Sequence, residues 1–349
     1  MSNADVHKFP CPKCGAQVDF DAATGVLLCA FCGHTATVPV TAQQIQEYDL
    51  EIALKEMLSA PQAMGYGDGK RSIKCQSCGA VNTIDTNLIS TACAFCGSNQ
   101  VVPQDQVVQV VKPESLLPFQ VERARATAEF RQWLGRGFFR PNPVKKIAQE
   151  ADARLQGVYL PFWTFDAFTS SWWQADAGYY YYVNETHWTT DDEGKRVQRT
   201  RKVQKVRWEP ASGHLQLPFD DVLVPAAQGV DRNMVERIYP FDTKALVPYD
   251  PGFLSGWGAE AYTVDLPSAW KTGQQIIEEQ VRTACSREVP GDTQRNLRVN
   301  SAFSNMTYKH VLFPVWIASY RYGEKIYHFL VNGQTGEVLG EAPVSWIKV

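Results

Sequence analysis

The sequence lacks an apolar run long enough to cross a membrane as a helix. Such a span takes about 20 mostly apolar residues, and the longest uncharged stretch in the most hydrophobic zone covers only residues 155–165. The N-terminus, MSNADVHKFPC, also lacks the basic and apolar segments of a signal peptide. We therefore expect a cytoplasmic protein without a transmembrane segment, either dissolved or peripheral at the inner membrane.

An excess of positive charge is missing as well. The 34 Lys and Arg residues are outnumbered by 37 Asp and Glu residues, for a net charge of −3. The whole molecule is therefore no polycation of the kind that coats nucleic acid, and any binding to a polyanion has to be local. A length of 349 residues with 44% hydrophobic residues is typical of a globular protein of two or three domains.

A phosphate-binding loop is absent, although the segment GYGDGKRS at 65–72 resembles one. The motif G-x4-G-K-[ST] needs a hydroxyl residue after the lysine to bind magnesium. Here Gly65 and Gly69 are one residue too close together, and Arg71 stands in place of the hydroxyl. The segment is better interpreted as a flexible linker.

Disulfides are not expected, because the nine cysteines occur in a chain without an export signal. Eight of them form two sets with the spacing C-x2-C-x14-C-x2-C, offset by 64 residues at all four positions. The first set is Cys11, Cys14, Cys29 and Cys32, and the second set is Cys75, Cys78, Cys93 and Cys96. Each set ends in the pentapeptide CAFCG, at 29–33 and at 93–97.

Four cysteines at this spacing are typical of a zinc ribbon. A structural zinc ion takes four ligands in a tetrahedron, and a filled set of four cysteines leaves no position for a catalytic water. We predict two separate ribbons with two zinc ions per chain. Two alternatives remain: buried or redox-active cysteines without metal, and one ion shared between both sets.

The remaining sequence predicts the fold class. Helices are expected at 41–60, 121–134, 143–155 and 268–285, and the strand VYLPFWT at 158–164 has an echo in VLFPVWI at 311–317. We expect two small all-β zinc ribbons plus a larger α+β domain made of two related halves, each a helix on an antiparallel sheet. The expected order is zinc ribbon 1 at 1–40, a linker helix at 41–64, zinc ribbon 2 at 65–104, a first half with a basic β-hairpin at 105–250, and a second half at 251–349.

A basic strand is the candidate site for polyanions. It comprises Lys195, Arg196, Arg199, Arg201, Lys202, Lys205 and Arg207, with no acidic residue between them. Alternation along a strand would put 199, 201, 205 and 207 on one side, where they could hold phosphates of nucleic acid or anionic lipid. The alternative is a solvated hairpin whose charges discourage pairing with other strands.

The aromatic residues before that strand, Trp172, Trp173 and the tyrosines at 179–182, suit base stacking or a membrane interface. We favour core packing for them.

Catalytic residues are not predicted. The candidates for a hydrolase, His187, His214, Asp220, Asp221 and Asp292, have no motif partner at a telling spacing, and Cys285 has no paired histidine. We expect that the protein is not an enzyme.

Five segments carry a resemblance to a known family. They are GVYLPFWTFDA, FDDVLVPAA, LVPYDPGFLSGW, YKHVLFPVWIASYRY and FLVNGQTGEVLGEAPVSWIK. Together with the paired ribbons they resemble bacterial double zinc-ribbon proteins that are often labelled primosomal-helicase-like and are found near genes of the phage-shock-type membrane-stress response. Longer relatives continue past VSWIK into membrane spans, whereas this chain stops at Val349. The resemblance therefore implies a role near the membrane, while the anchor of those relatives is not carried over.

Two functional hypotheses follow. The first is a non-enzymatic adaptor or scaffold that mediates protein–protein interaction in a membrane-stress or membrane-remodelling complex, with a phage-shock-type coat protein as the implied partner. The second is a nucleic-acid-binding zinc-ribbon protein that uses the strand at 195–207. Neither ribbon is notably basic, so the second hypothesis depends on that strand.

Overall fold

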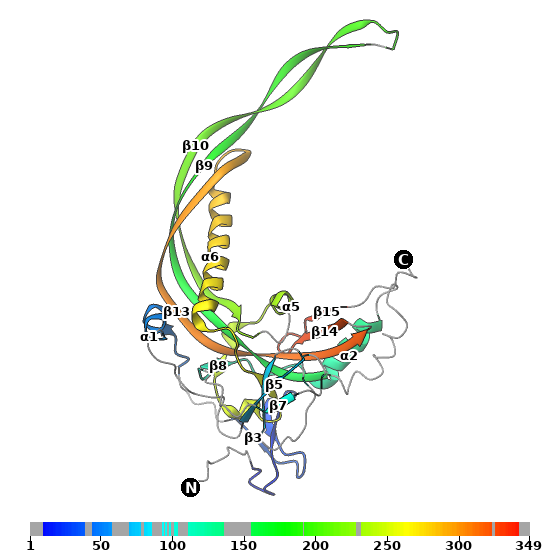
Figure 1. Ribbon diagram of the computed structural model, residues 1–349, viewed down its shortest axis with the longest axis vertical. Coiled ribbons are helices and arrows are strands. Elements are labelled where there is room, and N and C mark those ends of the chain that lie inside the picture. Colours follow the sequence, from blue (N-terminus) through cyan, green and yellow to red (C-terminus); the bar gives the residue numbers. More distant parts are fainter. Residues whose placement is uncertain are drawn as a thin grey trace. The chain divides into compact units, whose positions relative to one another are not determined.

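The fold is mostly β, as the computed structural model in Figure 1 shows. It describes residues 10–38, 44–57, 70–77, 80–85, 93, 95, 98, 101–103, 111–135, 155–190, 192–227, 232–322 and 325–341. The predicted fold class, two ribbons plus an α+β domain of two helix-and-sheet halves, is wrong. Strands dominate the described residues, and most of them join one large sheet that also contains β5, β6 and β7 of the expected second ribbon.

Two compact units share the chain. The first comprises Met1–Phe165, Leu223–Lys271 and Thr307–Val349, and the second comprises Asp166–Val222 and Thr272–Met306. Four long elements contribute residues to both units: β9 (Leu155–Thr190), β10 (Arg196–Pro225), α6 (Leu266–Glu288) and β13 (Thr293–Tyr322). The five-segment division expected from the sequence stays a prediction.

The first unit holds the shorter elements. Its strands are β1 (Asp19–Asp21), β2 (Val26–Leu28), β3 (Thr35–Ala36), β4 (Tyr48–Asp49), β5 (Lys70–Cys75), β6 (Val81–Asp85), β7 (Val101–Pro103), β8 (Ser115–Leu116), β11 (Val247–Pro248), β12 (Gly258–Glu260), β14 (Lys325–Asn332) and β15 (Val338–Gly340). Its helices are α1 (Leu50–Met57), α2 (Arg123–Gly135) and α5 (Arg232–Arg237), with 3-10 turns at Thr243–Ala245 and Pro251–Leu254. Strands β1, β2 and β3 form an antiparallel sheet of their own.

The echo between 158–164 and 311–317 corresponds to a repeated hydrogen-bond pattern. Trp163 on β9 donates from Nε1 to the carbonyl of Val264 at 2.9 Å, and Trp316 on β13 donates to the carbonyl of Val121 at 2.8 Å. Both tryptophan side chains are buried, so each indole N–H needs such a partner.

Short parallel pairings repeat in the same way. Gly258 of β12 pairs with Val158 of β9, and Ser115 of β8 pairs with Val311 of β13. The segment that leads into α2 contains β8, and it pairs with β13 and not with β9, the strand that follows α2 in the chain. The segment that leads into α6 contains β12, and it pairs with β9 and not with β13, the strand that follows α6. The repeated parts are therefore interlocked and not consecutive in the chain.

The helix predictions had mixed outcomes. Helices expected at 121–134 and 268–285 are confirmed as α2 and α6. The helix expected at 41–60 begins only at Leu50, because the Asp49 side chain accepts a hydrogen bond from the Ile52 N–H at 2.9 Å and Tyr48 pairs with Tyr308 of β13. The helix expected at 143–155 lies outside the described residues, apart from Leu155, which begins β9.

The second unit contains a long hairpin. Strand β10 pairs with β9, and Figure 1 shows the two strands twisting around each other in green. Ile277, Val281 and Cys285 form the buried stripe of α6 in this unit, at intervals of four residues. Among the described helices, none has both the length and the apolar character to span a bilayer.

Candidate metal centre

Four sulfur atoms gather where the segment before β1 meets the connection between β2 and β3. The Sγ atoms of Cys11, Cys14, Cys29 and Cys32 all lie within 4.8 Å of one another. Cys11 Sγ is 3.5 Å from Cys32 Sγ, and Cys14 Sγ is 3.6 Å from Cys29 Sγ. Four sulfurs placed about 2.3 Å from one zinc ion are about 3.8 Å apart, so the spacing fits a tetrahedral metal site. It does not fit a disulfide, whose sulfurs are about 2.05 Å apart.

Backbone geometry holds the four thiols in place. The N–H of Gly15 donates to the carbonyl of Cys11 at 2.8 Å, and the N–H of Gly33 donates to the carbonyl of Cys29 at 2.9 Å. Both turns need a positive φ, +74° at Gly15 and +70° at Gly33, which glycine adopts without steric cost. Each C-x2-C-G pair is therefore a tight knuckle that brings its two sulfurs to the same point.

The thiols influence one another's ionisation. Burial raises the pKa of Cys11, but the backbone N–H groups of Lys13 and Cys14 and the neighbouring sulfurs lower it to about 7. At Cys14 the backbone N–H of Ala16 lowers the pKa, whereas Cys32, burial and the other sulfurs raise it to about 12. Thiolates this close repel each other, so the cluster favours ionising one thiol at a time unless a cation neutralises all four.

The ribbon is fastened to a loop of the same unit. Ser255 Oγ donates to the carbonyl of Val18 at 2.6 Å, and Trp257 Nε1 donates to the carbonyl of Phe20 at 2.9 Å. The rings of Phe20 and Phe253 meet edge-on, with centres 5.2 Å apart. These contacts hold the sheet side of the ribbon and leave the knuckle side to face outward.

The second cysteine set is described only in part. Cys75 and Cys93 are buried, whereas Cys78 and Cys96 lie outside the described residues. In the first set, the N–H of the first cysteine in each knuckle donates to the carbonyl five residues later. The second set repeats this bond, from Cys75 to Ala80 at 2.9 Å and from Cys93 to Ser98 at 2.8 Å. The backbone at Cys75 and Cys93 is therefore hydrogen-bonded as in the first set.

The two copies of CAFCG have opposite surroundings. Phe31, in the first copy, is 88% exposed, whereas Phe95, in the second, is fully buried. Phe95 packs in a core cluster with Phe162 and Phe313, and its carbonyl accepts hydrogen bonds from Ser319 Oγ and from His328 Nε2, the latter at 2.6 Å. Burial of one copy and exposure of the other were not predicted.

The basic strand carries its charges on the surface, and some of them are paired with carboxylates. Lys195 lies just before β10 and the other six basic residues lie on it, all exposed. Glu185 of β9 is 2.8 Å from Lys205 Nζ and 3.8 Å from an Arg201 nitrogen, and this pairing lowers the pKa of Glu185. Arg207 pairs with Glu209 at 3.0 Å. Glu185 lies on the neighbouring strand and Glu209 follows the basic run on β10, so neither acid could be seen within the run itself.

Most of the aromatic residues beside that strand are exposed. Core packing is correct for Trp173, which is 5% exposed, but wrong for Trp172 and for the tyrosines at 180–182. Lys202 Nζ lies 4.7 Å from the ring centre of Tyr182, and the Arg196 guanidinium lies 5.8 Å from that of Trp188. These cation–π contacts cover part of the basic strand with aromatic rings.

The remaining polar candidates of the second unit do not meet at one point. Carboxylate oxygens of Asp220 and Asp221 lie within 4.8 Å of those of Asp166. His214 Nε2 is 2.8 Å from Ser170 Oγ, and Asp292 accepts the backbone N–H of Tyr180 at 2.7 Å.

His187 is exposed on β9, and Cys285 is buried on α6, where burial raises the pKa of its thiol. A buried thiol with a raised pKa is a poor nucleophile. Absence of enzymatic activity stays a prediction.

Comparisons with known proteins add one relative. YdjG of Bacillus subtilis strain 168, described as an uncharacterized protein, is 25% identical over 342 residues, which cover 98% of this chain and 91% of YdjG. No protein-family model matches the chain, and no solved structure matches it. The likeness to YdjG extends over nearly the full length of both chains and carries no information on activity.

Proposed function

We propose that this protein is a non-enzymatic, zinc-binding adaptor that docks a protein partner through the exposed knuckle of its first ribbon. One observation carries the proposal: Phe31 is 88% exposed while Phe95, in the same pentapeptide, is fully buried. Removing a phenylalanine side chain from water is worth roughly 1.5–3 kcal/mol. A partner that buries Phe31 would gain that free energy.

The buried copy indicates what such a partner must offer. Around Phe95 the chain supplies an apolar pocket, and two side-chain donors, Ser319 and His328, satisfy the backbone carbonyl. A partner surface for Phe31 would combine an apolar cavity with a hydroxyl or imidazole donor at its rim. Both knuckles would then use the same chemistry, one within the chain and one between chains.

Zinc is the metal that this donor set favours. Four thiolates in a tetrahedron suit zinc, and an ion bound in this way stabilises the fold without an open position for chemistry. In the first ribbon the ion would be held by Cys11, Cys14, Cys29 and Cys32. In the second it would be held by Cys75, Cys78, Cys93 and Cys96, for two ions per chain. The matching backbone bonds at Cys75 and Cys93 support this assignment.

The partner class to test first is a phage-shock-type coat protein, which the family resemblance implies. The test is affinity purification of the tagged full-length chain from its native host after nuclease treatment, followed by mass spectrometry. We expect a protein partner with the native chain and with Trp188→Ala, a control that removes an aromatic side chain of 62% exposure. We expect Phe31→Ala to lose it.

Retention of the same partner by Phe31→Ala would overturn the docking proposal. Recovery of nucleic acid in place of protein, with partners lost after nuclease, would favour the alternative hypothesis of a nucleic-acid-binding protein. The ion pairs of Arg201 and Lys205 with Glu185 give that alternative less support than the sequence did.

A further inference from the structure

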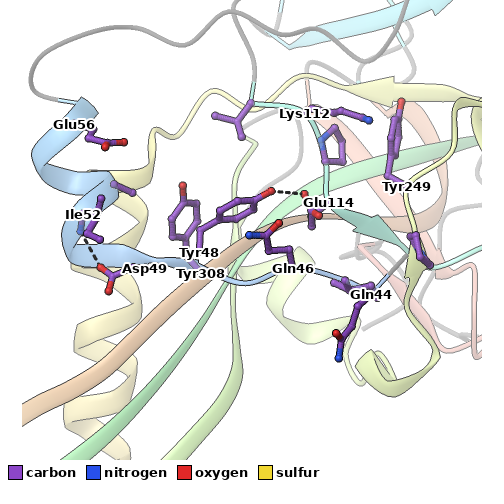
Figure 2. A pocket seen from close by; sticks show the side chains of 15 residues that line it. Gln44, Gln46, Tyr48, Asp49, Ile52, Glu56, Lys112, Glu114, Tyr249 and Tyr308 are labelled. Atoms are coloured by element: carbon purple, nitrogen blue, oxygen red, sulfur yellow. Dashed lines mark hydrogen bonds between the residues drawn. The ribbon is translucent and has the colours of Figure 1, made fainter. Parts of the chain in front are cut away.

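A cavity of about 560 Å³ opens in the first unit, away from the cysteines. Helix α1 and the segment before it form one wall, and the segment at 111–114 with Pro248 and Tyr249 forms the other, as Figure 2 shows. The volume is in the range of small-molecule sites.

Aromatic rings line the cavity on both sides. The ring centres of Tyr48 and Tyr308 are 5.9 Å apart, and Tyr249 stands on the opposite side in Figure 2. Tyr308 is 8% exposed and is held by the pairing of β4 with β13, so its ring belongs to the rigid part of the wall. The faces of such rings carry partial negative charge.

Carboxylates outnumber ammonium groups in the lining. The charged residues that line it are Asp49, Glu56, Glu114 and Lys112, three acids against one base. Glu47, next to the cavity, is paired with Lys309 at 2.8 Å and adds no net charge. An anion is therefore disfavoured here and a cation is favoured.

Burial and the negative charges in the lining raise the pKa values of two of the tyrosines. Tyr48 Oη donates to Glu114 Oε2 at 3.0 Å, and burial followed by this bond and the charge of Glu114 raises the pKa of Tyr48 to about 12. Burial followed by the charge of Glu56 also raises the pKa of Tyr308. The carboxylates thus act on both rings of the inner wall.

The chain already places one ammonium group on this lining. Lys112 Nζ lies 5.7 Å from the ring centre of Tyr249, within the range of a cation–π contact. Lys112 is exposed, so its side chain can move aside for a ligand of the same charge.

We propose that this cavity binds an organic cation of the alkylammonium class, with the charged head against the tyrosine faces and near Glu114 and Glu56. The ring faces attract the cation, the carboxylates neutralise it, and the apolar residues Ile52 and Ala53 contact its alkyl part. The proposal is independent of the metal centre and of the docking knuckle.

The test compares choline with 3,3-dimethylbutan-1-ol, which has the same shape without the charge, by titration calorimetry on the full-length protein. We expect choline to bind at least about fivefold more tightly than the neutral alcohol, and Glu114→Gln to weaken choline by a similar factor. Glu51→Gln is the control, because Glu51 lies on α1, which forms one wall, but it pairs with Lys55 and does not line the cavity. A third ligand, Nα-acetyl-lysine N-methylamide, keeps the side-chain ammonium group. Binding at least as tight as that of choline would indicate a lysine side chain of another protein, and weaker binding would indicate a small quaternary ammonium compound.

Equal binding of choline and its neutral analogue would overturn the proposal, and so would failure of all the cations to bind at millimolar concentration. Equal weakening by Glu114→Gln and Glu51→Gln would also overturn it. Because Glu114→Gln could act by loosening the wall, Tyr48→Phe serves as a second variant. It removes the hydroxyl bond to Glu114 but keeps the ring, and we expect it to keep choline binding within about threefold.

Discussion

Identical residues in this chain have different roles according to their neighbours. Phe31 and Phe95 share the pentapeptide CAFCG, yet one is exposed and the other lies in the core. The N–H of Cys29 and the N–H of Cys93 make the same bond to the carbonyl five residues later, so this local bond does not account for the difference. The difference comes from residues more than 200 positions away, Ser319 and His328, that receive only the second copy.

A buried histidine illustrates the same dependence. His310 is 2% exposed and packs against the rings of Trp163 and Tyr262. Its Nδ1 lies 2.8 Å from the carbonyl of Val111, and because a carbonyl only accepts, Nδ1 carries the proton. Burial lowers the pKa of His310 to about 4, although the bond to Val111 acts in the opposite direction.

Because of His310, we expect the free energy of unfolding to fall at acidic pH. The unfolded chain protonates His310 near pH 6.5 and the folded chain only near pH 4, so its contribution to stability is complete above about 6.5 and is lost as the pH falls through this range. Between pH 7 and pH 4.5 the loss is about 2.5 kcal/mol. Denaturant unfolding of His310→Gln, which keeps a donor for Val111, should show a correspondingly smaller fall. An equal fall in both proteins would contradict the assignment.

At the scale of elements, pairing decides what a strand presents. The basic run on β10 has no acid in its own sequence, but Glu185 on β9 neutralises part of it and the rings of Tyr182 and Trp188 cover two more cations. The basic residues of β10, which are adjacent to no acid in the sequence, are therefore partly paired or covered by residues of β9. The exposed charges still suit a hairpin that avoids pairing with other chains.

A prediction for β10 follows from this pairing. The triple charge reversal Arg199→Glu, Arg201→Glu and Lys205→Glu should change affinity for a single-stranded oligonucleotide by less than about twofold, since two of the three charges are already paired. Fluorescence anisotropy at several salt concentrations measures it. A drop in the salt dependence by roughly two to three counterions would show instead that the strand contacts phosphates.

At the scale of the molecule, both cysteine sets are attached to the rest of the first unit. The first ribbon is held by Ser255, Trp257 and Phe253, and the second set contributes Cys75, at the end of β5, to the large sheet. Loss of the proposed ion from the first ribbon should therefore change the environment of the Trp257 ring. Loss of the proposed ion from the second set should instead lower the stability of the large sheet.

Metal analysis tests the two-site assignment. We expect two zinc ions per purified chain, and one in Cys29→Ser, which should disorder the first ribbon and shift tryptophan fluorescence while the main unfolding transition persists. Cys285→Ser is the control, because Cys285 lies on α6 outside both sets. One zinc ion in the native chain would refute the second site, and two ions in Cys29→Ser would refute the ligand assignment.

Features that depend on short spacing could be predicted from the sequence. Such features include the repeated C-x2-C motifs, the helices α2 and α6, and the similar aromatic segments at 158–164 and 311–317. They could be predicted because a C-x2-C turn or a helix face is defined by residues a few positions apart. The start of α1 was missed because Asp49 caps the helix while Tyr48 pairs with a distant strand.

How the parts combine depends on contacts between residues that are far apart in the chain. The segment before α2 pairs with β13 and the segment before α6 pairs with β9, through contacts between residues 100 or more positions apart. The burial of Phe95 and the walls of the cavity also depend on such long-range contacts. No local pattern encodes these contacts, because burial is set by which surfaces meet and not by the residues that adjoin in the chain. For that reason the first cluster of four cysteines could be predicted from spacing, while the fold class could not.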